Sequence, residues 1–123
     1  MKIPFRNIKF FTQIIILSII FNLSLGGCSK YSNEVEANLT KLKKTKACSG
    51  CDLSGIELIS FDLKKADISG ANLTGAILSR SDLTGANLTD TNLSDTDLMG
   101  VNLTGATLTN TNLTRVKLSS KNE

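Results

Sequence analysis

Cys48 and Cys51, which enclose Ser49 and Gly50, are the side chains whose type and spacing suit chemistry best. In an exported protein such a pair can form a disulfide, or act as a redox couple if its thiolate is accessible. The sequence contains no His and no second pair of this kind, so it offers no zinc site and no histidine-based catalytic triad. No Gly-rich phosphate loop is present. We therefore expect no enzyme activity, no catalytic residue, no metal and no cofactor, with a thiol redox protein as an alternative.

These cysteines lie at the start of a five-residue repeat. Residues 51–120 form fourteen units such as Ala71-Asn72-Leu73-Thr74-Gly75, with Leu at the third position of every unit except the one containing Ile68. Apolar residues at alternating gaps of two and three do not fit a helix, and a turn residue in every unit opposes a flat strand. The chain must bend at each unit, which predicts a solenoid.

The units resemble those of the pentapeptide-repeat family: a small residue, then Asp or Asn, then Leu, then two loosely specified residues. The resemblance implies an all-β fold, a right-handed quadrilateral β-helix with four units per coil, over residues 51–120. First and third positions would face inward. Extending this register backwards places Cys48 at a third position and Cys51 at a first position, which favours a disulfide or simple packing over redox catalysis.

A coil of four units aligns residues that are twenty apart. Asn72, Asn92 and Asn112 would then stack in a ladder. Three apolar residues would project outward on one side, where other units carry polar residues, and an arginine would stand at its corner. These four residues form a candidate partner face: Ile59, Ile77, Arg80 and Met99. The alternative is that they have no role, because scattered apolar residues are common on protein surfaces.

The segments on either side of the repeat differ. Residues 33–44 have acids first, lysines last, and Val35, Leu39 and Leu42 on one face, which predicts a short amphipathic helix that caps the first coil. The alternative is a lysine-rich, partly helical linker. The tail, residues 121–123, offers no such cap. We therefore expect either fraying of the last coil or a partner that covers it, such as a second copy in an end-to-end homodimer through the C-terminal coil.

The N-terminal segment has the pattern of an export signal. A basic start and an apolar stretch over residues 10–21 precede Leu25-Gly26-Gly27-Cys28, which resembles the lipobox of bacterial lipoproteins. The resemblance implies a signal peptide at 1–27, acylation of Cys28, and a lipid-anchor linker with the capping helix at 28–50. The expected location is the bacterial cell envelope, anchored in a membrane and facing the periplasm or lumen. A retained membrane anchor and a plain cleaved signal are the alternatives.

Charge limits the choice of partner. Without residues 1–27 the chain carries eleven basic and eleven acidic side chains, so no nucleic-acid binding is expected. The leading hypothesis is a non-catalytic, membrane-tethered scaffold or binding module whose protein partner the sequence does not identify. Some members of the family act as DNA mimics that inhibit topoisomerases, and this is a second alternative. The export signal, the balanced charge and the short repeat oppose it.

Overall fold

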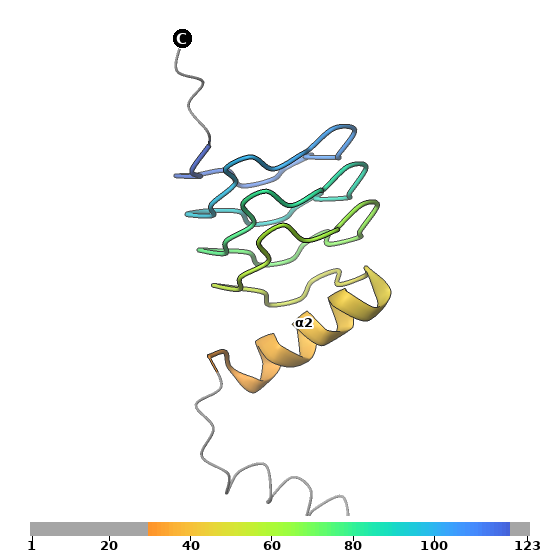
Figure 1. The fold of residues 1–123 in the computed structure, drawn as a ribbon, viewed down its shortest axis with the longest axis vertical. Helices are drawn as coiled ribbons and strands as arrows, with labels where there is room; N and C mark the ends of the chain where they lie inside the picture. The colour runs from red at the N-terminus through yellow and green to blue at the C-terminus, as the bar shows by residue number, and fades with distance from the viewer. Residues whose placement is uncertain (1–29, 119–123) are drawn as a thin grey trace, which may run out of the picture. The chain divides into compact units, whose positions relative to one another are not determined.

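The computed structural model describes residues 30–118. From Tyr31 onward they belong to one compact unit. This part of the chain begins with helix α2 (Asn33–Thr45) and continues as stacked coils, as Figure 1 shows. The coils contain isolated parallel bridges in place of long strands, and each bridge joins second-position residues twenty apart, from Ala47↔Asp67 to Asp97↔Lys117. One turn of the solenoid therefore takes four five-residue units, as the resemblance to the pentapeptide-repeat family implies.

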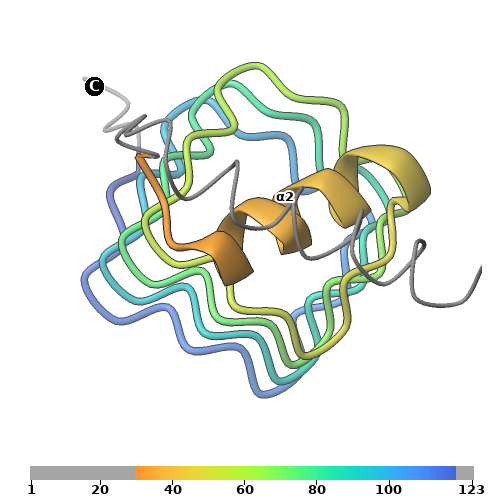
Figure 2. The same ribbon diagram turned by 90° about the horizontal axis from the view of Figure 1, so that it is seen from below.

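Each unit builds one side and one corner of a coil. On a side, the Leu73 N–H donates to the Asn92 carbonyl of the next coil (2.8 Å), and the Asn92 N–H donates back to the Ala71 carbonyl (2.9 Å). At a corner, the Ala76 N–H closes the turn on the Leu73 carbonyl (3.0 Å). The fifth residue of the unit has a left-handed backbone, which Gly75 adopts without strain at a φ of 68°. Four such corners give the square outline seen in Figure 2.

The core consists of two columns of inward side chains. The third-position residues from Leu53 to Leu98 are all buried, and small first-position residues such as Ala66, Ala71 and Ala86 pack beside them. Three first positions hold a buried hydroxyl, and in each case this hydroxyl donates to a third-position carbonyl of the coil below: Ser81 to Leu58, Thr91 to Ile68 and Thr96 to Leu73. Polar residues are therefore accepted inside because their hydrogen bonds are made there.

Helix α2 lies across the first coil in Figures 1 and 2. The Ser32 hydroxyl accepts a hydrogen bond from the Val35 N–H (3.3 Å) at its start, and the Lys46 N–H donates to the Leu42 carbonyl (2.8 Å) at its end. Val35 and Leu42 are buried in the same core cluster as the repeat leucines, and Leu39 is half-buried against that cluster. The helix thus has a polar outer face and an apolar face toward the solenoid.

Candidate interaction surfaces

One side of the solenoid carries the residues of the candidate partner face. The bridges Glu57↔Ile77 and Ile77↔Asp97 place the units beginning at residues 56, 76 and 96 directly above one another. Ile59 and Met99 are 54% and 46% exposed, while Ile77 between them is half-buried. The structure therefore brings the three apolar residues to one side, in successive coils.

Arg80 stands at the corner of this side. It is exposed and has a left-handed backbone with a φ of 62°. Gly100 occupies the same corner in the next coil, where a Cβ would lie 3.6 Å from Cγ of Arg80. The aliphatic part of the Arg80 side chain therefore leans along the corner toward Gly100, beside the side that carries Met99.

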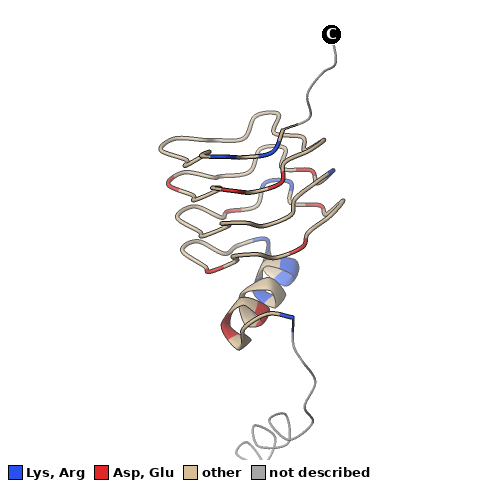
Figure 3. Ribbon diagram, turned by 90° about the vertical axis from the view of Figure 1, so that its left-hand side faces the viewer, with Lys and Arg blue, Asp and Glu red and all other residues tan. Residues whose placement is uncertain are grey.

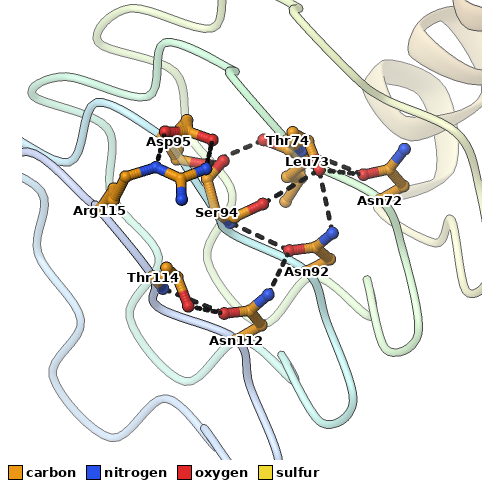
Figure 4. Close-up of polar contacts among 10 residues, drawn as sticks. Asn72, Leu73, Thr74, Asn92, Ser94, Asp95, Asn112, Thr114 and Arg115 are labelled. Carbon is orange, nitrogen blue, oxygen red and sulfur yellow. Dashed lines mark hydrogen bonds and ion pairs between the residues drawn. The ribbon is translucent and has the colours of Figure 1, made fainter.

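Polar side chains on the neighbouring side are bound to each other (Figure 4). Asn72 accepts from the Thr74 N–H and hydroxyl (3.2 and 2.6 Å), which closes the turn of its own unit. The Asn112 amide donates to the Asn92 side-chain oxygen (3.0 Å), whereas the Asn92 amide donates to the Thr74 hydroxyl (3.0 Å). The predicted asparagine ladder is thus direct in its upper step and passes through a threonine in its lower step.

Contacts within the coils lower the pKa of several carboxylates. The Thr84 hydroxyl, the Thr84 N–H and the nearby Lys64 lower the pKa of Asp82, and the Arg115 guanidinium lowers the pKa of Asp95. In the same way, the Lys64 N–H and the Lys46 ammonium lower the pKa of Asp62. A general acid would need a raised pKa, so these groups are unsuited to that role. Figure 3 shows acidic and basic residues interspersed along the described coils.

Cys48 and Cys51 are joined in a disulfide next to α2, with their Cα atoms 5.3 Å apart. Both residues are buried, and Sγ of Cys48 lies 3.5 Å from the Asn38 carbonyl oxygen of the helix. A disulfide sulfur has no hydrogen to donate, so this is a packing contact. A thiol redox site needs an accessible sulfur, and α2 covers this pair. No cluster of potential metal ligands occurs within residues 30–118.

The last described coil has an exposed apolar end. The Leu pattern continues unchanged to Leu118, which suggests buried side chains throughout. In the structure Leu108, Leu113 and Leu118 are 37%, 43% and 63% exposed, because none of the described residues covers them. The sequence of residues 121–123, which offers no cap of the kind predicted at residues 33–44, had pointed to such an end.

Cys28 and the rest of the predicted signal peptide lie outside the described residues. Within the part of the chain that the structure describes, no helix has the length and apolar character needed to cross a membrane.

Comparisons with known proteins agree with this architecture. The family model for pentapeptide repeats matches residues 47–80 and 81–119, which is more than half of the chain. A crystal structure of a pentapeptide repeat protein from the thylakoid lumen of Arabidopsis thaliana is similar over 76% of this chain, with 33% identity and a TM-score of 0.59. This chain spans only 59% of that protein. No curated protein is similar enough to count as a match.

HetL, a pentapeptide repeat protein involved in regulating heterocyst differentiation in the cyanobacterium Nostoc sp. strain PCC 7120, is 32% identical. The similarity covers 55% of this chain and 36% of HetL, with a TM-score of 0.35. A right-handed quadrilateral β-helix is the fold that the family match and the Arabidopsis structure imply, and the four-unit coil seen here agrees with it. The repeat in the sequence, the coil in the structure and the family match lead to one assignment: this chain belongs to the pentapeptide-repeat family.

Proposed function

We propose that the protein is a non-catalytic, membrane-tethered scaffold that binds a protein partner through the side containing Ile59, Ile77 and Met99. The observation that carries this proposal is the exposure of Ile59 and Met99 on the same side of the solenoid, with Ile77 between them. Ile59 and Met99 stand at fourth positions, where most other units of the repeat carry a polar residue, commonly Ser or Thr. An apolar side chain is unfavourable on a surface exposed to water and favourable at an interface. Arg80 at the corner adds a side chain of the kind enriched at interface centres.

The anchor in this proposal is acylated Cys28. The sequence pattern around Cys28 supports the anchor, and several acyl chains on one residue would hold the protein firmly in a bilayer. The Arabidopsis relative is a protein of the thylakoid lumen, which supports a location on the far side of a bacterial membrane, in the periplasm or lumen. The tether would keep the solenoid close to partners in that compartment and raise their effective concentration.

Helix α2 has the role of an N-terminal cap in this proposal. The Asn38 side-chain amide donates to the Asp52 carbonyl (3.0 Å), and the Glu57 N–H donates to the Tyr31 hydroxyl (3.1 Å). The Asp52 carbonyl and the Glu57 N–H lie on the lower edge of the first coil, which is the edge that another coil would bind if the stack continued in that direction. The helix and Tyr31 thus satisfy the edge with side chains, as terminal units of solenoids must.

The two alternative functions receive less support. The buried disulfide opposes thiol redox catalysis. Residues 30–118 carry equal numbers of acidic and basic side chains, ten of each, whereas a DNA mimic needs a strongly acidic surface. The scaffold proposal requires neither an accessible thiol nor a large negative charge.

The test is mild cross-linking in native cells, followed by recovery of the protein and mass spectrometry of the intact protein and its partners. We expect an acylated Cys28 and one reproducible envelope partner. The double change Ile77→Asp and Met99→Asp should abolish partner recovery, while Thr109→Asp, at an exposed fourth position of another side, should leave it unchanged. An unmodified protein that retains Met1 would contradict the anchor, and a partner still recovered with the double variant would contradict the face.

A further inference from the structure

Charged side chains are unevenly distributed along the stack. Residues 30–65, which contain α2 and the first coil, carry seven lysines and five acidic side chains. Residues 66–118 carry three basic and five acidic side chains. The equal totals therefore combine a positive end, at the cap, with a negative end, at the later coils. In Figure 3 the blue part of α2 lies at the end of the helix that joins the first coil.

The lysines of the cap and the first coil gather around the C-terminal end of α2. The Lys43 ammonium lies 5.8 Å from the centroid of the Phe61 ring, and the Lys46 ammonium pairs with Asp62 of the same unit (2.9 Å). That unit ends with two exposed lysines. We call this surface the lysine face, and it consists of Lys41, Lys43, Lys44, Lys46, Lys64 and Lys65.

Half of the lysine face has no counter-charge within the described chain. Lys46 and Lys64 form ion pairs with aspartates of the coils. Three exposed lysines form no ion pair with any residue of 30–118: Lys41, Lys44 and Lys65. The helix dipole favours a cation in the last turn of α2, but Lys41 and Lys65 lie outside that turn. Unpaired like charges on one surface attract an anionic partner.

The proposed anchor holds this end of the stack beside the bilayer. Cys28 precedes Asn33, the first residue of α2, by five positions, and such a segment spans at most about 18 Å. The helix has 13 residues, so it is about 20 Å long. An anchored protein therefore has its cap, with the lysine face, closer to the lipid headgroups than its later coils.

We infer that the lysine face binds anionic phospholipid headgroups of the membrane in which Cys28 is anchored. The inference rests on the anchor proposed above and does not depend on the side containing Ile59. Lysine is depleted in protein–protein interfaces, whereas basic clusters next to a membrane attachment bind anionic lipid. A few lysines would hold a free protein weakly, but a tethered protein meets the surface at high effective concentration. The attraction then orients the stack, with its negative end away from the bilayer.

The experiment measures the accessibility of lysines in the anchored protein. The protein purified from its native membrane is added to vesicles of phosphatidylcholine alone, or of phosphatidylcholine mixed with phosphatidylglycerol. A water-soluble amine reagent labels exposed lysines, and mass spectrometry gives the rate at each position. We expect labelling of Lys41, Lys44 and Lys65 to be about fivefold slower on the anionic vesicles, with the difference lost at high salt. Lys117, exposed in the last described coil, should label equally on both.

Two variants with the same change in charge test which lysines are responsible. Lys41→Gln with Lys44→Gln removes two positive charges from the lysine face. Lys117→Glu changes the net charge by the same amount in the last described coil. All three positions are exposed, so neither variant should disturb the fold. We expect the first variant to lose most of the protection of Lys65 by anionic lipid, and the second to keep it.

The outcomes distinguish this inference from the anchor itself. A protein that floats with neither kind of vesicle would overturn the anchor and the inference together. A protein that floats with both kinds, with Lys41 and Lys44 labelled equally on each, would leave the anchor standing and overturn the inference. Protection of Lys65 that persists in the first variant would also overturn it. Equal labelling on vesicles together with cross-links from Lys41 to an acidic envelope protein would assign the lysine face to that protein instead of lipid.

Discussion

At the scale of single residues, the repeat accommodates its buried polar side chains because each has a hydrogen-bond partner. The second-position Asp or Asn closes the turn of its unit, and the Ser or Thr hydroxyls at first positions bind a carbonyl of the coil below. Among the described residues, no buried side-chain nitrogen or oxygen lacks a hydrogen-bond partner. Two predictions follow from these local bonds.

Replacing the buried hydroxyl of Thr96 by a methyl group of similar size should cost little stability. It is buried and donates to the Leu73 carbonyl (2.8 Å), which the Ala76 N–H also reaches (3.0 Å). Thr96→Val keeps the volume and leaves that carbonyl with one donor, so we expect a loss of about 1 kcal/mol or less in the free energy of unfolding. Thr96→Ala also removes a packed methyl and should cost more in urea titrations. A valine variant less stable than the alanine variant would contradict this account.

Acid should destabilise the protein through the second-position aspartates whose pKa is lowered in the folded state, such as Asp82. The pKa of Asp82 in the folded state lies below its ordinary value of 3.8, chiefly through the Thr84 hydroxyl, so folding is favoured above that pH and the advantage is lost as the pH falls through the folded pKa. Melting temperatures should therefore decline on the acid side of about pH 4.

Asn at this position keeps the side-chain oxygen that accepts from Thr84 and does not titrate. Asp82→Asn should flatten part of the acid decline and change little at neutral pH. An acid decline as steep as that of the unaltered chain would show that Asp82 does not contribute to it. Asp67, whose pKa the Ser69 hydroxyl lowers in the same way, provides a second position for the same change.

At the scale of elements, the helix and the coils were predictable to different degrees. The five-residue period predicts a solenoid, because the chain must bend in every unit. The number of units in a coil came from the resemblance to the pentapeptide-repeat family, and the bridges between residues twenty apart agree with it. The helix was predictable from Val35, Leu39 and Leu42 and from its terminal charges, and it runs from Asn33 to Thr45. The hydrogen bonds that Asn38 of the helix and the preceding Tyr31 make with the first coil were not predictable. They join residues fourteen and twenty-six positions apart, and no periodic pattern marks them.

Loss of the buried Leu42 side chain should loosen α2 from the first coil. Leu42 is 1% exposed and belongs to the core cluster, so Leu42→Ala should lower the free energy of unfolding by about 2 to 5 kcal/mol. Lys41→Ala, on the exposed face of the same helix, is the matched control and should be nearly neutral. Equal effects of the two changes in denaturant titrations would mean that α2 does not pack as the structure shows.

At the scale of the whole molecule, the repeat makes the protein a stack of coils. The number of a residue in the sequence therefore determines on which side of the solenoid it lies and in which coil. The side containing Ile59, Ile77 and Met99 follows from this mapping and could be located in the sequence by counting in steps of twenty. The repeat pattern alone suggests that Leu108, Leu113 and Leu118 are buried like the earlier leucines, and only the polar tail at residues 121–123 pointed to their exposure. No feature of the repeat identifies the partner proposed for this side.

The mapping can be tested by insertion. A copy of residues 86–90 placed after Asp90 adds one side, so it should rotate Met99 off the side that carries Ile59 and Ile77 while every inward position stays apolar or small. A copy of residues 71–90 at the same point adds a full coil and should keep Met99 on that side, one coil further along. Circular dichroism should be close to that of the unaltered chain for both insertions. Cross-linking to the envelope partner should fall for the five-residue insertion and persist for the twenty-residue one. If both insertions abolish cross-linking equally, binding depends on the coil in which Met99 lies and not on the side of the solenoid that it occupies.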